Sequence, residues 1–318
     1  MKTKRIFAIT LLLVMVLVTG YSSVGAGGLT GTQRMMMAPL ARQVIRDATP
    51  ADPTPPQPVT LLDAEMRIFH STKTDQDYRI YVSFPPGYDA DSPPKYPVIY
   101  SLDGNWHFPI DEFAERQLLM NEELGKLIIV GIGYPTDNDE EIQYLRWLDM
   151  VPENRADAFL AFLQEELIPY INTNYRTAKN DITLAGHSYG GLFTLYTLFT
   201  ATDAFDRYIA LSPALWYHPD WDGKRLIFDL EEEYFAAQNP NNPKLPVQLF
   251  LSIGELEPED EWWGAFQPWM VSNVIEFNEI LESRGYKGLS LDMRIIEGLG
   301  HAGSYLGAFT RGLVSVFQ

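Results

Sequence analysis

The segment Gly186–Gly190, which reads G-H-S-Y-G, constrains the fold of this chain more than any other feature. The pattern G-x-S-x-G is typical of a sharp turn between a strand and a helix, where a bulky residue two positions from the serine would clash. An apolar, β-rich run at 181–185 precedes the turn, and a helical apolar pattern at 191–199 follows it. We therefore predict that Ser188 lies exposed between a strand and a helix. The alternative is a glycine-rich turn in which the serine is incidental.

Strand-like and helix-like segments alternate along the rest of the chain. Short β-branched or aromatic runs predict strands at 78–84, 97–102, 127–132, 182–185, 208–211, 247–253 and 289–296. Helical spacing of apolar residues predicts helices at 156–171, 192–200, 271–283 and 302–316. This alternation indicates an α/β fold of the α/β-hydrolase type, with a mostly parallel central sheet flanked by helices. The first of these strands can pair antiparallel at the sheet edge.

The N-terminus has the features of an export signal. The basic segment Met1–Arg5 precedes an apolar run, Ile6–Val18, which is short for a membrane span, and Val24 and Ala26 are small enough for a signal peptidase. We predict cleavage after Ala26 and a secreted or periplasmic protein; the alternative is an uncleaved N-terminal anchor. The predicted parts of the chain are a signal peptide at 1–26, a proline-rich tether at 27–58 and an α/β domain at 59–318.

Charge and composition exclude several classes of partner. The 318 residues carry a formal net charge of −18, so the chain repels nucleic acids and anionic membranes, and we predict neither as a partner. The absence of cysteine excludes disulfides and lipid attached to cysteine. No metal-ligand spacing and no phosphate-cradling loop stands out in the sequence, so we predict neither a metal nor a cofactor. The oligomeric state stays open.

A serine hydroxyl needs a general base, and that base needs an acid to orient it. In α/β-hydrolases the acid and then the histidine follow the serine along the chain. His218 and His301 are the two histidines after Ser188, and His218 precedes the predicted acid. His301 lies in a glycine-rich loop between the last predicted strand and the last predicted helix. We therefore predict His301 as the base.

The acid is expected in the loop after the strand at 247–253. Glu257 follows the glycine that ends this strand by three residues and is the first candidate. Glu255, and after it Glu259 and Asp260, stay open as alternatives in the same loop.

Ester hydrolysis also needs two donors for the oxyanion. The backbone N–H of Tyr189, directly after the nucleophile, is one candidate. The N–H of Asn105, in the loop after the strand at 97–102, is the other.

Six segments give the chain a resemblance to a known family: Tyr78–Tyr88, Tyr96–Asn105, Gly131–Pro135, Gly186–Gly191, Leu211–Trp216 and Gly254–Glu257. They resemble bacterial esterases grouped with ferric-enterobactin and ferric-bacillibactin esterases. This branch belongs to a larger family of putative esterases that also includes esterase D-like and feruloyl esterases. The resemblance runs from about Tyr78 to the C-terminus. It implies Ser188 as nucleophile, His301 as base, and Asn105 and Tyr189 as oxyanion donors, whereas some members look more like Ser–His dyads.

The resemblance also suggests residues that contact substrate. It places Trp106 and Trp216 at the border of the pocket, although each could equally pack in the core. Arg146 lies in a stretch that is richer in arginine in the relatives, where arginines suit an anionic iron–catecholate substrate. Since only one arginine is present here, the substrate stays open between siderophore lactones, acetylated or feruloylated polysaccharides and small acyl esters. Alternatively, Arg146 pairs with Asp149.

These patterns lead to one main functional hypothesis. We expect an exported serine esterase that hydrolyses a carboxylic ester through an acyl-enzyme. One alternative is an acyltransferase that uses the same residues, and the other is a binding module that has lost catalysis.

Overall fold

The computed structural model describes residues 61, 63–91, 95–218, 224–259 and 269–318. The predicted signal peptide and tether lie outside the described residues. Leu61–Gln318 form one compact unit. None of the helices in the described part combines the length and the apolar character needed to cross a membrane.

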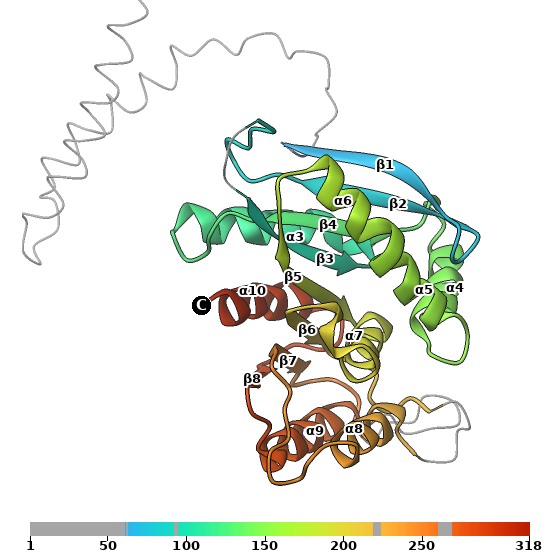
Figure 1. Cartoon of the computed structure of the whole chain (residues 1–318), viewed down its shortest axis with the longest axis vertical. Coiled ribbons are helices and arrows are strands. Elements are labelled where there is room, and N and C mark those ends of the chain that lie inside the picture. The colour runs from blue at the N-terminus through green and yellow to red at the C-terminus, as the bar shows by residue number, and fades with distance from the viewer. Residues whose placement is uncertain (1–60, 62, 92–94, 219–223, 260–268) are drawn as a thin grey trace, which may run out of the picture. The chain divides into compact units, whose positions relative to one another are not determined.

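Within these residues, eight strands form one sheet in the order β1-β2-β4-β3-β5-β6-β7-β8 (Figure 1). Their bounds are β1 Ala64–Ser71, β2 Gln76–Ser83, β3 Tyr96–Leu102, β4 Ile128–Gly133, β5 Thr177–His187, β6 Arg207–Leu211, β7 Gln248–Gly254 and β8 Ser290–Ile296. β2 pairs antiparallel with β1 and β4, and every pair from β4 to β8 is parallel. The predicted α/β fold with a mostly parallel sheet is confirmed.

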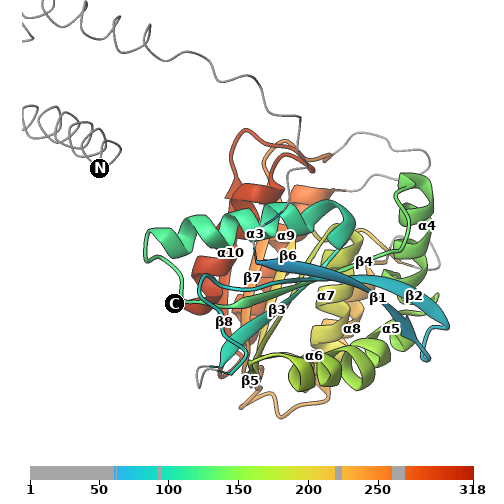
Figure 2. The ribbon, with the colours of Figure 1, turned by 90° about the horizontal axis from the view of Figure 1, so that it is seen from above.

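Helices cover both faces of this sheet (Figure 2). The α-helices are α3 Gly104–Met120, α4 Asp139–Met150, α5 Ala156–Phe162, α6 Ile168–Asn174, α7 Tyr189–Thr200, α8 Leu226–Ala236, α9 Met270–Arg284 and α10 Tyr305–Phe317. α3 and α10 pack their apolar residues on one face, whereas α4 to α9 contribute to the larger core on the other. Because both faces are buried, the inner strands are almost continuously apolar, and all six residues of β4 are buried.

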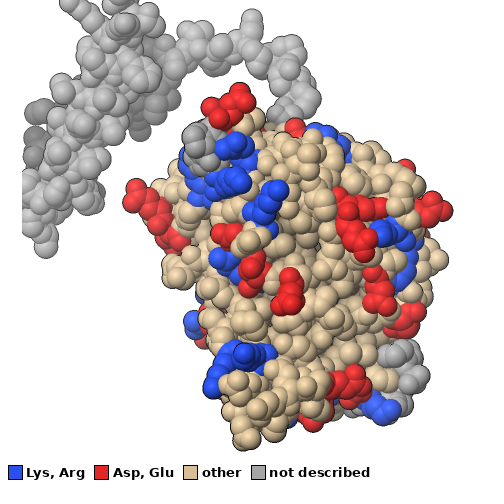
Figure 3. Space-filling view, in the orientation of Figure 1, with Lys and Arg blue, Asp and Glu red and all other residues tan. Residues whose placement is uncertain are grey.

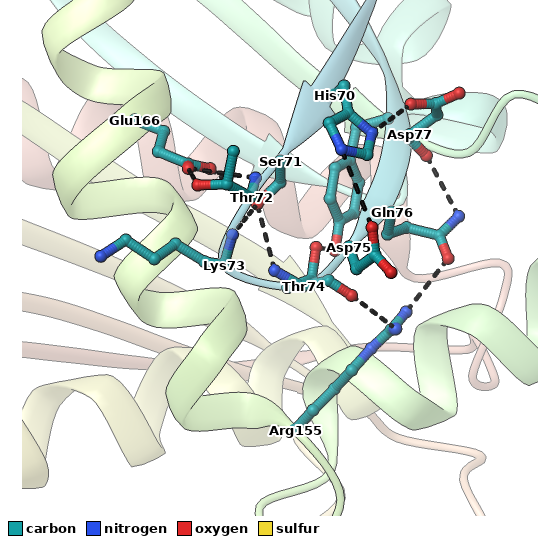
Figure 4. Close-up of polar contacts among 11 residues, drawn as sticks. His70, Ser71, Thr72, Lys73, Thr74, Asp75, Gln76, Asp77, Arg155 and Glu166 are labelled. Atoms are coloured by element: carbon teal, nitrogen blue, oxygen red, sulfur yellow. Dashed lines mark hydrogen bonds and ion pairs between the residues drawn. The ribbon is translucent and has the colours of Figure 1, made fainter.

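A π-helical turn, η1 (Leu163–Leu167), joins α5 to α6, and its side chains fasten the β1–β2 turn (Figure 4). Glu166 accepts hydrogen bonds from the Ser71 hydroxyl, at 2.7 Å, and from the Thr72 N–H, at 3.1 Å. Arg155 donates to the Thr74 carbonyl and to the Gln76 side chain. The edge hairpin is therefore held to the body of the molecule by polar contacts.

The structure corrects several predicted elements. β2 is antiparallel, as expected, but the edge belongs to β1, whose mixed polar sequence did not predict a strand. β5 begins at Thr177 rather than 182, because its first residues are partly exposed and polar and so lack the apolar pattern. α3 and α4 were not predicted; α3 contains Pro109 and α4 is largely polar.

Candidate active site

Ser188 occupies the tight turn between β5 and α7, with φ 60° and ψ −116°. A Cβ atom on Gly186 would lie 2.3 Å from the Gly190 carbonyl oxygen, so any side chain there would clash. A Cβ atom on Gly190 would lie 3.3 Å from the Asp103 carboxylate, which is a tight contact. The predicted strand–turn–helix arrangement is confirmed, and the positive φ of a serine marks backbone strain at this turn.

The loops after β7 and β8 bring Glu257 and His301 together. The Nδ1 atom of His301 lies 2.7 Å from the Oε2 atom of Glu257. The Glu257 side chain is fully buried, whereas the His301 side chain is 34% exposed. In the described part of the chain, the Nε2 atom of His301 has no hydrogen-bond partner. One nitrogen of the imidazole is thus held by a carboxylate and the other is left to exchange a proton.

The other oxygen of Glu257 is held as well. Its Oε1 atom accepts hydrogen bonds from the Gly254 N–H, at 2.8 Å, and from the Ser212 hydroxyl, at 2.5 Å. Ser212 is buried and has a φ of 43°, which is rare for a non-glycine residue. The sequence interpretation missed Ser212, because the Leu211–Trp216 segment carries no signal for a buried hydroxyl.

The alternative acids lie elsewhere. Glu255 is exposed and accepts a hydrogen bond from the Gly298 N–H at 2.6 Å. Glu259 accepts from the Ser272 N–H at 2.8 Å. Asp260 lies outside the described residues, and the excluded base, His218, is buried 3.8 Å from Asp229. Among the described candidates, the structure brings Glu257 alone to His301.

His187, which directly precedes Ser188, contacts the loop that carries His301. Its Nε2–H donates to the backbone carbonyl of His301 at 3.0 Å, and the centres of the His187 and His301 rings lie 4.4 Å apart. Burial, together with the nearby His301, His107 and Arg146, holds the pKa of His187 well below its ordinary range. His187 is therefore a neutral hydrogen-bond donor, and it was not among the predicted site residues.

The two predicted oxyanion donors lie in the first turns of two helices. Asn105 is the second residue of α3, and Tyr189 is the first residue of α7. Neither backbone N–H has a hydrogen-bond partner among the described residues, as is usual at helix N-termini. The Asn105 side chain bonds to the backbone of Tyr134 and Thr136, which fixes the position of the loop.

Arg146 pairs with Asp103, so the alternative pairing with Asp149 is wrong. Its Nε and Nη2 atoms each lie 2.8 Å from one oxygen of the Asp103 carboxylate, and Nη2 also donates to the His187 carbonyl at 3.3 Å. Asp149 instead pairs with Arg155 at 2.5 Å. Arg146 is thus a buried cation fixed beside the turn that carries Ser188.

Two aromatic residues flank this cation. The Arg146 guanidinium lies 5.6 Å from the ring centre of Trp106 and 5.5 Å from that of Tyr189. Trp106 is half-buried and donates to Asp139 at 2.9 Å. Trp216 is also half-buried, and its ring lies 6.1 Å from that of Tyr189. Both tryptophans keep part of their surface exposed near Ser188, and their contact with substrate stays a prediction.

The described residues contain no group of three or more His, Asp or Glu side chains arranged to hold a metal ion.

Comparison with known proteins gives consistent results. The family described as "Putative esterase" matches residues 71–267. The chain is 31% identical to the ferri-bacillibactin esterase BesA of Bacillus subtilis, over 76% of this chain and 85% of that protein. It is 33% identical to the siderophore triacetylfusarinine C esterase of Aspergillus fumigatus, over 66% of this chain and 73% of that protein.

A solved structure, the BES protein from Bacillus cereus, superposes with a TM-score of 0.70 at 29% identity, covering 84% of this chain and all of that one. The siderophore hydrolase EstB from Aspergillus nidulans superposes with a TM-score of 0.69 at 26% identity, covering 82% of this chain and 98% of that one.

Proposed function

Because the chain belongs to the Putative esterase family and is a carboxylic ester hydrolase, we propose that Ser188, His301 and Glu257 form its catalytic triad. The contact between His301 and Glu257 carries this proposal, since it joins loops 44 residues apart on the same side of the sheet as Ser188. A buried carboxylate bonded to one imidazole nitrogen fixes the tautomer in which the other nitrogen accepts a proton.

The reaction then follows the ordinary course of a serine hydrolase. His301 removes the proton from the Ser188 hydroxyl as its oxygen attacks the ester carbonyl. The Tyr189 and Asn105 N–H groups donate to the oxyanion that forms. His301 passes its proton to the leaving alkoxide, and the acyl-enzyme is released by water, which His301 activates in turn. Glu257 stabilises the imidazolium in both steps.

Arg146 supplies fixed positive charge next to this reaction. Its guanidinium touches the carbonyl of His187, one residue before the nucleophile, and its carboxylate partner Asp103 directly precedes α3. We infer that the Arg146–Asp103 pair holds the oxyanion loop against the nucleophile turn and favours negative charge on the substrate oxygen.

The relatives point to the substrate class. Two of them are esterases of siderophores, one of which is bacillibactin, and we propose that this chain cleaves an ester bond of a siderophore. The Arg146 guanidinium is buried and bonded to both oxygens of Asp103, so it is not free to bind an anionic iron complex directly. A panel that compares iron-free with iron-loaded siderophore esters therefore tests the substrate directly.

The first experiment measures the release of p-nitrophenol from p-nitrophenyl acetate by the full chain, with Ser188→Ala as control. Turnover that disappears in the folded variant supports the triad. Activity retained by Ser188→Ala contradicts it. If neither protein turns over the ester, labelling of Ser188 by a fluorophosphonate distinguishes a selective esterase from a binding module, and product analysis with an added alcohol distinguishes hydrolysis from acyl transfer.

Export is part of the proposal, supported by the leader-like sequence of Met1–Ala26. Fractionation of cells tests export, and the molecular mass of the protein recovered outside the cytoplasm shows where its N-terminus lies. A mature N-terminus at residue 27 indicates cleavage, and an intact N-terminus on a membrane-bound protein indicates an anchor.

A further inference from the structure

A pocket of about 310 Å³ lies where β3 and β5 begin. Lys95 directly precedes β3 and Arg176 directly precedes β5, and both line the pocket together with Lys179 and Tyr88. None of its described lining residues is Asp or Glu. In the face drawn in Figure 3, Lys and Arg atoms gather in the upper part of the molecule, where these strands begin in Figure 1. Three cations thus share one hollow of a chain whose net charge is −18.

Arg176 is unusual because it has no acidic partner among the described residues. Every described arginine except Arg176 and Arg311 lies within 4.0 Å of a carboxylate oxygen. Lys95 and Lys179 have no ion pair in the described part of the chain either. In a chain with 42 acidic and 24 basic residues, neighbouring carboxylates are plentiful. An arginine without a described acidic partner, grouped with two lysines around one pocket, therefore points to a bound ligand.

Two further groups in the pocket lack partners that an anion would supply. The Nε atom of Arg176 is buried and has no hydrogen-bond partner among the described residues. An unsatisfied buried donor of this kind is unfavourable unless a ligand bonds to it. The Tyr88 hydroxyl accepts a bond from the Arg176 backbone N–H at 3.1 Å, which leaves its own proton available to donate.

The nearest carboxylates do not neutralise the pocket. Glu65 contacts the hydroxyl of Tyr175, a lining residue, but it already pairs with Arg67 at 2.6 Å. Asp89 and Asp91 flank Ala90 in the sequence and are exposed, but neither lines the pocket. The positive charge of Lys95, Arg176 and Lys179 is therefore available to a bound anion.

This pocket is separate from the candidate active site. Ser188 follows the last residue of β5, and Arg176 precedes its first residue. The 11 residues of β5 lie between them, so the two sites are at opposite edges of the sheet.

We propose that this pocket binds a phosphate group, held by Lys95, Arg176, Lys179 and the Tyr88 hydroxyl, as a site distinct from the proposed esterase centre. The chemistry suits a dianionic oxygen ligand, because a guanidinium, two ammonium groups and a neutral donor converge on one hollow. The phosphate comes either from a soluble phosphate compound or from a lipid headgroup.

The test compares two double variants of the full chain that change the net charge equally. Arg176→Gln/Lys179→Gln removes two cations of the pocket. Lys244→Gln/Arg311→Gln removes two exposed cations without described acidic partners that lie outside it. Calorimetry with inorganic pyrophosphate probes soluble phosphate. Co-sedimentation with phosphatidylcholine vesicles that contain phosphatidic acid, against vesicles without it, probes a headgroup.

We expect the wild type and the control variant to bind at least one probe, the pocket variant to bind it at least about tenfold more weakly, and all three to hydrolyse ester equally. Weaker binding of pyrophosphate by the pocket variant identifies a soluble ligand. Weaker binding of vesicles alone identifies a lipid headgroup. Failure of the wild type to bind either probe overturns the proposal. An equal loss in both variants also overturns it, because net charge rather than the pocket would then explain binding. Since Ser188 is unchanged, failure of the esterase proposal leaves this test intact.

Discussion

On one side of Ser188 Glu257 holds His301, and on the other side Asp103 holds Arg146. Both contacts join a buried carboxylate to a nitrogen base, at 2.7 Å and 2.8 Å. The imidazole is 34% exposed and can gain or lose a proton, whereas the guanidinium is 7% exposed and keeps its charge. The difference teaches that similar ion pairs suit different chemistry: in the proposed mechanism the histidine side moves protons, and the arginine side supplies fixed charge.

The largest expected effect tests the histidine side. Glu257→Gln is expected to lower kcat by roughly 10²- to 10⁴-fold, because the amide no longer orients His301 or stabilises its imidazolium. Glu255→Gln, two residues away and exposed, is the matched control and should change kcat less than about twofold. Steady-state kinetics on p-nitrophenyl acetate measure both. Equal losses in the two variants would show that the buried carboxylate has no special role.

Arg146→Lys tests the arginine side. The lysine keeps the charge but cannot bond both oxygens of Asp103, so we expect kcat to fall by roughly 10- to 100-fold with a smaller change in KM. Arg155→Lys alters the comparable pair with Asp149, which contacts the β1–β2 turn, and should lower the melting temperature without lowering kcat. A variant of Arg146 that loses stability but keeps wild-type kcat would restrict this pair to a structural role.

Ser212→Ala sharpens the comparison at a single hydrogen bond. Removal of the hydroxyl that holds Glu257 is expected to lower kcat by roughly tenfold, in line with one bond to a charged group. Ser101→Ala removes a similar bond, of 2.6 Å, to the buried Asp111, and should affect stability only. If both variants keep wild-type kcat, Glu257 does not depend on Ser212 for its position.

The smallest effect concerns Asp111, a buried carboxylate with no cation among its described partners. Burial, opposed by hydrogen bonds from Ser101 and Tyr305, raises its pKa to about 7. The native state therefore keeps this proton up to about pH 7, whereas the unfolded chain releases it near pH 4, so Asp111 makes stability fall as pH rises between these values.

Asp111→Asn removes this titration. Its melting temperature, relative to that of the wild type, should rise by several degrees between pH 4 and pH 8. Asp75→Asn, at a side chain that is 99% exposed, should show no such trend. A constant difference for Asp111→Asn across this pH range would contradict the raised pKa.

Sequence patterns predicted the parts of the molecule that depend on local spacing. The strand, the turn at Ser188 and the helix after it follow from neighbouring residues, because glycine and apolar spacing act within a few positions. Seven strands were predicted for the same reason. β1 and the first residues of β5 were missed, since their mixed polar sequence forms strands only when it pairs with neighbours in the sheet.

The amino-acid sequence by itself determined the fold class, the strand–turn–helix at Ser188 and a short set of candidates: Ser188, His301 and four acids in one loop. Only the tertiary structure decided that Glu257 rather than Glu255 faces His301, and that Arg146 pairs with Asp103 rather than Asp149. Arg146 and Asp103 are 43 residues apart, and Ser212 and Glu257 are 45 apart. Contacts over such separations are set by how strands pair and which groups are buried, and local spacing carries no record of either.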